Sequence, residues 1–330
     1  MSPLAPRYLD LARSGELDRR AAALEALLAP CRLCPHECGD DRRRGATGRC
    51  RTGMRAHLAS ACLHRGEEPV ISGARGSGTI FFGGCNLHCV FCQNHTLSQP
   101  PAGAALPGPE GSADELGAAM LALQAEGAHN INWVSPSHVV PQAVAGLAAA
   151  ARAGLRIPIV YNSNGYDGLA ALRLLDGVVD VYLPDLKYGA DEPAARYSRA
   201  HAYTRHAIAA LVEMKRQVGD LVQGDDEVAV RGLLVRHLVL PNELSHTRAV
   251  LETIARRLGP GTWLSIMSQY YPAHHAARVP LLSRPLRQGE YAPVLAWLEE
   301  LGLEEGFAQE LESAATYRPD FARPGHPFER

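Results

Sequence analysis

Short, continuously apolar runs alternate along the chain with longer stretches rich in Ala and Leu. The runs predict β-strands over residues 79–82, 131–134, 157–161, 178–183, 232–240 and 262–267. The stretches predict helices over residues 113–125, 142–153, 168–175, 192–218 and 247–258. Apolar strands separated by helices are typical of a parallel sheet that is buried on both faces, so the pattern indicates six βα units.

Six such units form either an incomplete TIM-like barrel or an open, doubly wound sheet, and the pattern alone does not separate the two. Both α/β architectures place the active site at the carboxyl ends of the parallel strands. The residues that follow each predicted strand are therefore the first candidates for a functional site.

The segments on either side of this alternating region have a different character. An apolar stripe at helical spacing predicts an amphipathic helix over residues 15–28, which Pro30 ends. Residues 31–77 are rich in Cys, Gly, Arg and turn formers and lack a long periodic segment, which predicts a small loop-rich lobe. The tail from about residue 304 is polar and interrupted by Pro, which predicts a loose or wrapping extension. We expect an N-terminal helix and Cys-rich lobe (1–75), a core (76–275) and a C-terminal helix with a tail (276–330).

The composition is that of an ordinary globular protein. The 330 residues are 46% hydrophobic and 21% charged, with a formal net charge of -2. Without a basic excess, we expect neither nucleic acid nor an anionic membrane surface to be bound by bulk electrostatics. The start of the chain mixes acids and bases, unlike a secretory signal, and no run of ~18 apolar residues predicts a membrane span. We therefore expect the protein in the cytoplasm.

The cysteines are concentrated near the start of the chain, with all eight at or before residue 92. A disulfide framework is atypical of a cytosolic chain of this length, so the clusters indicate metal binding. Cys85, Cys89 and Cys92 follow the first predicted strand with the spacing C-x3-C-x2-C. Three thiolates on one loop can hold three irons of a 4Fe-4S cluster and leave the fourth iron open. The alternative is a structural zinc site completed by a nearby histidine, either His88 or His95.

A second group of four cysteines precedes this motif. Cys31, Cys34, Cys38 and Cys50 have the spacing C-x2-C-x3-C-x11-C. Four thiolates close a coordination sphere, so this site is either structural or electron-carrying, and both zinc and an iron–sulfur cluster remain open. His36 lies within the group and could replace one thiolate. Cys62 has no close partner in sequence and is interpreted as a small buried hydrophobic residue.

Polar residues follow several of the predicted strands. The candidates at these strand ends are Asn130 and Asn132, then Asn162 and Asn164, then Asp185 and Lys187. Amide side chains offer a donor and an acceptor together, which suits a zwitterionic ligand. Arg236 and His237 are adjacent in a strand, so one of the two should point into the barrel. His64, Glu67 and Glu68 lie before the first strand, where a structural role is at least as consistent as a catalytic one.

Several stretches together resemble a known family, the radical S-adenosylmethionine (SAM) enzymes. The hallmark of that family is C-x3-C-x-aromatic-C after the first strand, and Phe91 is the aromatic residue here. More closely, the chain is similar to homologues of the pyruvate formate-lyase activating enzyme, often termed PflX-type. The matching stretches are CRLCPHECGDDRRRGATGRC, GEEPVISGARGSGTIFFGGCNLHCVFCQN, EGAHNINWVSPSHVVPQ, PIVYNSNGY, VVDVYLPDLKY, RGLLVRHLVLPN and SIMSQYYPAH.

The resemblance implies a fold, two cofactors and a reaction. The fold would be a partial (βα)6 TIM-like barrel, with a 4Fe-4S cluster on Cys85, Cys89 and Cys92 and SAM on the open iron. One electron from a reductant such as flavodoxin or ferredoxin would cleave SAM to a 5′-deoxyadenosyl radical that abstracts hydrogen from a substrate. The substrate would be either a glycyl-radical or other protein that is activated, or a small molecule. The Gly-Gly-Glu motif that often binds the SAM amino group in this family is missing after the second predicted strand.

A second class of function remains open from the residues alone. Both cysteine groups could hold zinc in a non-catalytic binding module for assembly or regulation. Colour distinguishes the two, because zinc is colourless and iron–sulfur clusters are brown. A six-unit barrel, which a zinc module would not need, favours the enzyme.

Overall fold

The structure is a computed structural model that describes residues 4–311, 321 and 327–328. Its strands are β1 (Ala56–His64), β2 (Ser77–Phe82), β3 (Glu110–Gly111), β4 (Ile131–Val134), β5 (Ile159–Asn162), β6 (Val181–Tyr182), β7 (Val222–Gln223), β8 (Ala229–Leu238), β9 (Trp263–Met267) and β10 (Gly306–Ala308). Its α-helices are α1 (Tyr8–Arg13), α2 (Glu16–Ala26), α3 (Pro69–Ser72), α4 (His95–Ser98), α5 (Ala113–Ala125), α6 (Val140–Arg152), α7 (Leu169–Leu174), α8 (Asp191–Ser198), α9 (Tyr203–Val218), α10 (Thr247–Leu258) and α11 (Gln288–Glu300). Short 3-10 helices cover Arg42–Arg44, Pro136–His138, Pro241–Glu243, Ala276–Arg278 and Pro280–Leu282.

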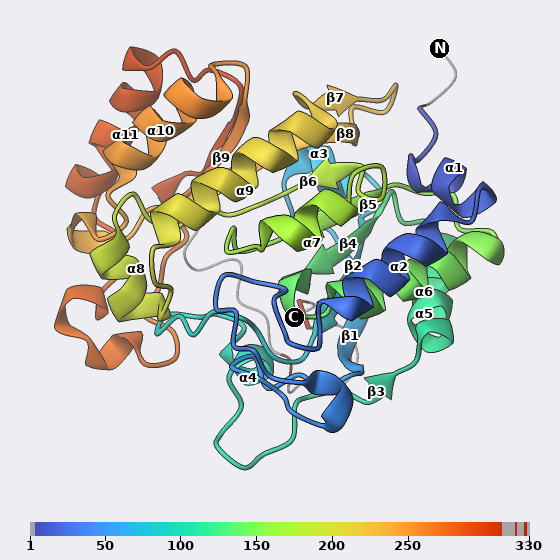
Figure 1. The fold of residues 1–330 in the computed structure, drawn as a ribbon. Helices are drawn as coiled ribbons and strands as arrows, with labels where there is room; N and C mark the ends of the chain where they lie inside the picture. The colour runs from blue at the N-terminus through green and yellow to red at the C-terminus, as the bar shows by residue number, and fades with distance from the viewer. Residues whose placement is uncertain (1–3, 312–320, 322–326, 329–330) are drawn as a thin grey trace.

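One mostly parallel sheet organises the molecule (Figure 1). The strand order is β10-β9-β8-β6-β5-β4-β2-β1-β3, and the pairs from β10 to β2 are parallel. The six predicted strands, β2, β4, β5, β6, β8 and β9, lie side by side in sequence order, whereas a doubly wound sheet would reverse direction partway. The path ends at β10 and β3 without closing among the described residues. The predicted partial barrel is therefore confirmed.

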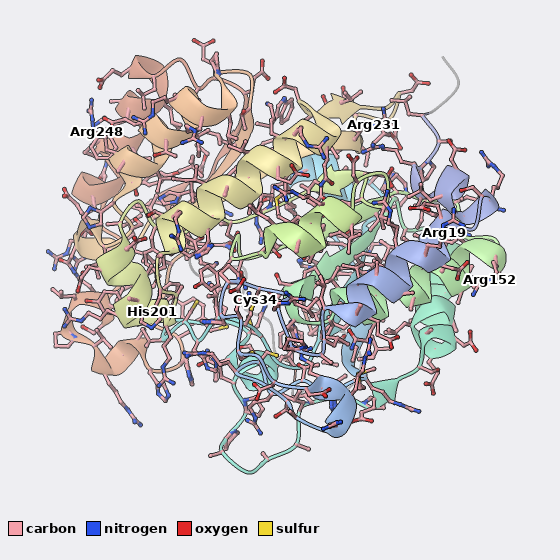
Figure 2. The ribbon with its side chains drawn as sticks, in the orientation of Figure 1. Arg19, Cys34, Arg152, His201, Arg231 and Arg248 are labelled. Carbon is pink, nitrogen blue, oxygen red and sulfur yellow. The ribbon has the colours of Figure 1, made fainter. Side chains whose placement is uncertain are left out.

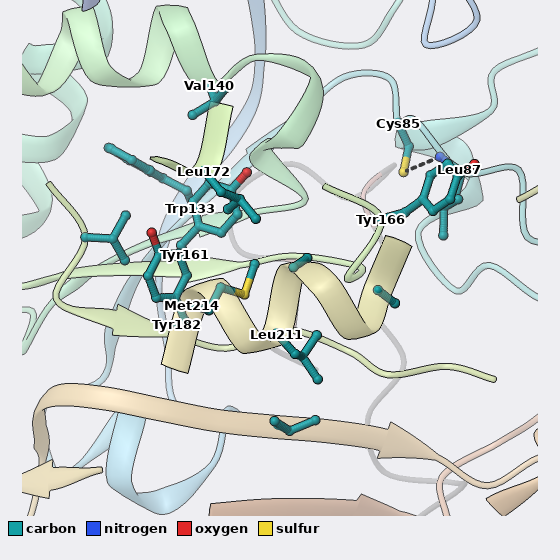
Figure 3. Close-up of a cluster of buried hydrophobic side chains, with 14 of the residues drawn as sticks. Cys85, Leu87, Trp133, Val140, Tyr161, Tyr166, Leu172, Tyr182, Leu211 and Met214 are labelled. Carbon is teal, nitrogen blue, oxygen red and sulfur yellow. Dashed lines mark hydrogen bonds between the residues drawn. The ribbon is translucent and has the colours of Figure 1, made fainter. Parts of the chain in front are cut away.

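The helices are placed as the apolar pattern requires. The predicted helices over 113–125 and 247–258 match α5 and α10, and Ser112 and Glu115 form a reciprocal cap that begins α5. Helix α2 packs against α6, and its Leu17 and Leu24 are fully buried. Large buried side chains, including Trp133, fill the space between the sheet and its helices (Figure 3). Among the described residues, no helix combines the length and apolar character that crossing a bilayer requires.

The predicted helix over 192–218 is wrong in one respect, because it is two helices. Arg199 and Ala202 adopt left-handed backbone conformations, with φ of 53° and 49°, and separate α8 from α9. The break contains no Gly or Pro that would have indicated it. In the structure, the carbonyls of Tyr197 and Ser198 accept hydrogen bonds from the amides of Val90 and His88. The interruption therefore brings the end of α8 to the cysteine loop.

Two segments expected to lack regular structure contribute strands. Strand β1 lies within the lobe predicted to be loop-rich, and it pairs antiparallel with β2. Its small and polar residues give a weak alternation, which is why the pattern did not show it. Strand β10 lies in the predicted loose tail and adds to β9 in parallel. Phe328, from the far end of the tail, stacks on His64 at 3.8 Å between ring centroids. Most of the remaining tail is outside the described residues.

Candidate functional site

The loop after β2 carries the C-x3-C-x2-C motif, and two glycines allow it to leave the strand. Gly83 and Gly84 precede Cys85, and Gly84 has a φ of 86°, a conformation that disfavours other residues. A Cβ atom at Gly84 would lie 2.6 Å from the backbone oxygen of Cys50. The loop therefore packs directly against the segment that carries the second cysteine group.

Each thiol of the motif has a polar contact. Leu87 N donates to Cys85 Sγ at 3.4 Å (Figure 3), and Asn164 Nδ2 lies 3.6 Å from the same sulfur. The other two contacts are Ser198 Oγ donating to Cys89 Sγ at 3.0 Å and Ser98 Oγ lying 3.2 Å from Cys92 Sγ. Burial raises the pKa of Cys85 to about 12 and that of Cys89 to about 11. Without a metal these groups are neutral thiols, and a metal must displace their protons to bind.

The three cysteines line one cavity of about 420 Å³ at the carboxyl ends of the strands. Its lining also includes Glu67, Glu68, Phe91, Gln93, Asn94, Asn162, Asn164, Asp185, Lys187, Arg236, Ser265, Met267 and Gln269. Phe91 lies against Tyr270 with 5.9 Å between ring centroids. The cavity therefore combines the predicted metal ligands with charged groups from the segment after β6, from β8 and from the segment before β2.

A network of charges forms one wall of the cavity. Arg236 Nε donates to Asp185 Oδ1 at 3.0 Å, and Lys187 Nζ donates to Asp185 Oδ2 at 2.5 Å. Arg236 also donates to Asn162 Oδ1 at 2.7 Å. Although burial opposes the effect, the charges of Lys187 and Arg236 hold the pKa of Asp185 below its usual value, so Asp185 is ionised.

Two adjacent glutamates complete this wall. Arg236 Nη1 lies 3.3 Å from Glu67 Oε2, and Asn132 Nδ2 donates to Glu67 Oε1 at 3.2 Å. Burial raises the pKa of both Glu67 and Glu68, and Arg236 partly offsets the rise. Glu68 Oε2 is buried without a hydrogen-bond partner among the described residues. An acceptor left unpaired beside a cavity is available to a ligand.

The structure separates the four predicted asparagines into two pairs. Asn162 and Asn164 line the cavity. Asn130 is fully buried outside it, with its amide oxygen accepting from Ser77 and its nitrogen donating to the Ile71 carbonyl. Asn132 is also absent from the lining and reaches the site only through Glu67. Both ends of the Asn130 amide are therefore engaged in packing contacts away from the cavity.

As strand alternation predicts, the side chains of Arg236 and His237 point to opposite faces of β8. Arg236 lines the cavity, whereas His237 is buried on the opposite face. His237 Nδ1 lies 2.6 Å from the Leu186 carbonyl, and Nε2 lies 2.9 Å from Thr247 Oγ1. His237 is therefore a structural residue.

The second cysteine group lies beside the first. Cys31 and Cys50 are buried, and Cys34 and Cys38 are half-buried. Arg42 Nη2 donates to Cys50 Sγ at 2.9 Å. Burial raises the pKa of Cys34 to about 12, and the thiols of Cys50, Cys38 and Cys31 each raise it further, so the four sulfurs are close enough to interact. Cys62 is apart from both groups and is buried with Phe81 and Leu97.

His36 links the two cysteine groups. Its Nε2 lies 2.8 Å from the carbonyl oxygen of Asn86, the residue after Cys85. The Asn86 side chain donates to the Tyr166 carbonyl and accepts from Asn164 Nδ2, both at 2.7 Å. Nε2 of His36 therefore faces the neighbouring loop and is not free to replace a thiolate as a metal ligand.

The first cysteine group fits a 4Fe-4S cluster by its chemistry. No three Cys, His, Asp or Glu side chains of the described residues converge as a group that could hold a metal ion. A 4Fe-4S cluster does not require convergence on one point, because each thiolate binds a different iron. The three thiols of Cys85, Cys89 and Cys92 border one cavity, with donors to the sulfurs and open space beside them. This arrangement fits a cluster with one iron facing a ligand.

Sequence reasoning missed several contributors to the site. Ser198 and Ser98 contact thiols from helix ends that carry no motif, so nothing in the pattern marked them. For Glu67 and Glu68, the sequence is at least as consistent with a structural role as with a catalytic one. Their adjacent carboxylates before a buried strand were the available signal, because a charged pair entering a core needs a partner.

Comparisons with known proteins give one family match and one similar protein. The sequence profile of the Radical SAM superfamily matches residues 79–222. A protein of Methanocaldococcus jannaschii, itself named as uncharacterized, is 31% identical over 300 residues. That similarity spans 90% of this chain and 82% of the archaeal protein.

Proposed function

The chain belongs to the radical SAM superfamily, and we propose that Cys85, Cys89 and Cys92 hold its 4Fe-4S cluster. Membership implies an enzyme of the radical SAM type that uses this cluster and SAM. When bound, the cluster and SAM supply a 5′-deoxyadenosyl radical, which abstracts hydrogen from a substrate. The protein contributes ligands, orientation and the exclusion of water.

The charged wall supports SAM binding at this cavity. The methionine part of SAM carries an amino and a carboxylate group, which need partners of opposite charge. Lys187 and Asp185 offer both charges, and the amides of Asn162 and Asn164 offer donors and acceptors beside them. Burial raises the pKa of the Cys89 thiol, and the charge of Lys187 partly offsets this rise. We propose these four residues as SAM contacts, with the Phe91 ring packing beside the cluster.

One observation carries the proposal, namely that the three motif thiols and the Asp185–Lys187–Arg236 network share a single cavity. The test is anaerobic reconstitution with iron and sulfide, followed by dithionite and SAM, with 5′-deoxyadenosine measured by chromatography. Native protein should produce 5′-deoxyadenosine, and Cys89→Ala should produce none. A colourless protein that retains zinc and yields no 5′-deoxyadenosine would instead support the zinc-binding module.

We propose a second metal at Cys31, Cys34, Cys38 and Cys50, either zinc or an auxiliary iron–sulfur cluster. The effect of the neighbouring thiols on the pKa values of Cys31 and Cys34 and the Arg42 contact to Cys50 support a shared site. Metal analysis separates the possibilities, because one cluster requires about four irons per chain and two require about eight. Loss of the additional metal in Cys34→Ala, with the first four irons kept, would locate it here.

The branch of the superfamily, the electron donor and the substrate are proposed from the sequence resemblance. We propose that the enzyme belongs with the homologues of the pyruvate formate-lyase activating enzyme, acts in the cytoplasm, and takes its electron from a flavodoxin or ferredoxin. Its substrate would be a protein, such as a glycyl-radical enzyme. Incubation with a candidate protein, reductant and SAM should then give a glycyl-radical signal in electron paramagnetic resonance. Hydrogen abstraction from a small molecule without such a signal would contradict the protein substrate.

A further inference from the structure

A basic surface lies over the loop that carries the cysteine motif, and we call it the basic face. It consists of Arg49, Arg51, Arg199, Arg205, His88 and His201. Three of its arginines and His201 are exposed, while Arg51 and His88 are half-buried. His88 lies between Cys85 and Cys89 in sequence, so the face reaches the metal-binding loop itself. His201 and Cys34 lie on the side that Figure 2 presents to the viewer.

Contacts hold this surface together. Tyr166 OH donates to the His201 carbonyl at 2.7 Å, and His88 Nε2 lies 3.2 Å from the Arg49 carbonyl. The rings of Tyr166 and His206 have 5.7 Å between their centroids, and Arg205 Nη2 lies 3.1 Å from His206 Nε2. The His88 amide donates to the Ser198 carbonyl at 3.1 Å, which brings the adjacent Arg199 to His88. The members therefore form one patch.

The charge of the patch differs from that of the whole chain. The patch holds four arginines, and the exposed acids Glu37 and Asp191 act on His206 at its rim. None of the four arginines has an ion pair among the described residues. The whole chain has a formal net charge of -2, so this positive charge is local. A positive surface favours association with a partner whose surface is acidic.

The basic face and the cavity are on different sides of the same loop. None of the six residues of the face lines the cavity. Beneath the face, His36 contacts both Tyr166, at 5.1 Å between ring centroids, and the Asn86 carbonyl beside Cys85. A partner docked on the face would therefore be close to the cysteine loop and would leave the cavity open to SAM and substrate.

We infer that the basic face is the docking surface for a small acidic electron-transfer protein. The inference rests on the proposed function, because it needs a cluster on Cys85, Cys89 and Cys92 to receive the electron. In this step the flavin or iron–sulfur centre of the donor is oxidised by one electron, and the cluster is reduced by one electron. Charge complementarity places the donor on the face before transfer.

The experiment uses a reduced acidic flavodoxin as the probe and follows cluster absorbance by anaerobic stopped flow. The test variant is Arg49→Glu with Arg205→Glu, and the matched control is Arg256→Glu with Arg257→Glu on α10, which reverses the same number of exposed charges elsewhere. At low ionic strength, the test variant should be reduced at least about tenfold more slowly than native protein. The control should match native protein, and added salt should narrow the difference.

Two further readouts keep the docking surface and the proposed function distinguishable. Reduction by dithionite and the resulting 5′-deoxyadenosine should be the same in native protein and in the test variant, since that small reductant needs no docking. Equal flavodoxin rates in native protein and the test variant, or equal losses in test and control variants, would overturn the docking surface alone. Should no cluster form at all, flavin fluorescence anisotropy still measures flavodoxin binding. Equal affinities for native and test proteins would then overturn the docking surface as well.

Discussion

Ser198 Oγ donates a hydrogen bond to Cys89 Sγ over a distance of 3.0 Å, although the two residues are 109 positions apart in the chain. Hydrogen bonds to cluster thiolates stabilise the reduced, more negative state and raise the reduction potential. Replacing Ser198 by Ala should therefore lower the midpoint potential. A net contribution of about 1 kcal/mol corresponds to a shift of roughly 40 mV for one electron.

Redox titration monitored by electron paramagnetic resonance measures this shift. Ser283→Ala, at an exposed serine away from the cavity, is the control and should leave the potential unchanged. An unchanged potential in Ser198→Ala, with full iron content, would show that the contact does not persist in the loaded protein.

Arg236 is predicted to be the costliest single side chain to remove from the charged wall. Replacing Arg236 by Ala would leave Asp185 and Glu67 without their shared cation in a buried site. Breaking a buried pair in this way costs about 3 kcal/mol, which denaturant unfolding at neutral pH would detect. Arg248→Ala, which removes an exposed pair to Glu300, should cost less than about 1 kcal/mol. Similar losses in the two variants would contradict the central role of Arg236.

The raised pKa of Glu68 predicts how stability depends on pH. The folded protein holds the Glu68 proton to higher pH than the unfolded chain does, so stability falls as pH rises through the interval above the ordinary value of 4.5. Glu68→Gln removes this fall, because Gln carries no charge to bury. The variant should match native protein near pH 4 and exceed its stability by about 1 kcal/mol at neutral pH.

Thermal unfolding across this pH range is the measurement, and Glu252→Gln on the exposed face of α10 is the control. A Glu68→Gln variant that is less stable than native protein at neutral pH would show that the carboxylate is paired after all.

Gly84 is predicted to be intolerant of any side chain. Gly84→Ala would place a Cβ atom against the Cys50 carbonyl and would hold Ala at a positive φ. Because the two cysteine groups meet at this contact, the metal bound by both groups should fall together, and the iron bound after reconstitution should fall with it. Gly289→Ala in α11, where a Cβ meets nothing within 4 Å, should keep the iron and be neutral or slightly stabilising. Full iron content in Gly84→Ala would contradict the close contact.

The parallel strands and their order along the chain could be predicted from the apolar pattern, because that pattern depends on local order, whereas the partial barrel was implied by the family resemblance. Apolar runs at βα spacing fix the strand sequence, and β4 was predicted to its end residues. The turn between α8 and α9 could not be predicted, since Arg199 and Ala202 take left-handed conformations that their side chains do not favour. The end of α8 before this turn instead makes tertiary contacts, because its last carbonyls accept hydrogen bonds from the cysteine loop.

The same limit applies to the side chains of the site. Asp185 and Lys187 are close in sequence at a strand end, so their place beside one another at the cavity could be anticipated. The ion pair of Glu67 with Arg236 joins residues 169 positions apart. It forms only when β8 takes its place in the sheet, so local sequence could not predict it. Asn130 shows the converse, because a residue at a suitable strand end is used entirely for packing.

The ion pair of Lys187 with Asp185 has a practical consequence for chemical labelling. Lys187 and Lys215 are the only lysines in the chain, with side chains 18% and 19% exposed, and Lys215 pairs with Asp220. Lysine-directed acylating reagents therefore find almost no accessible side-chain amine on the surface. The rate at which Lys187 is acylated, read by mass spectrometry, would act as a built-in reporter of whether the cavity is filled.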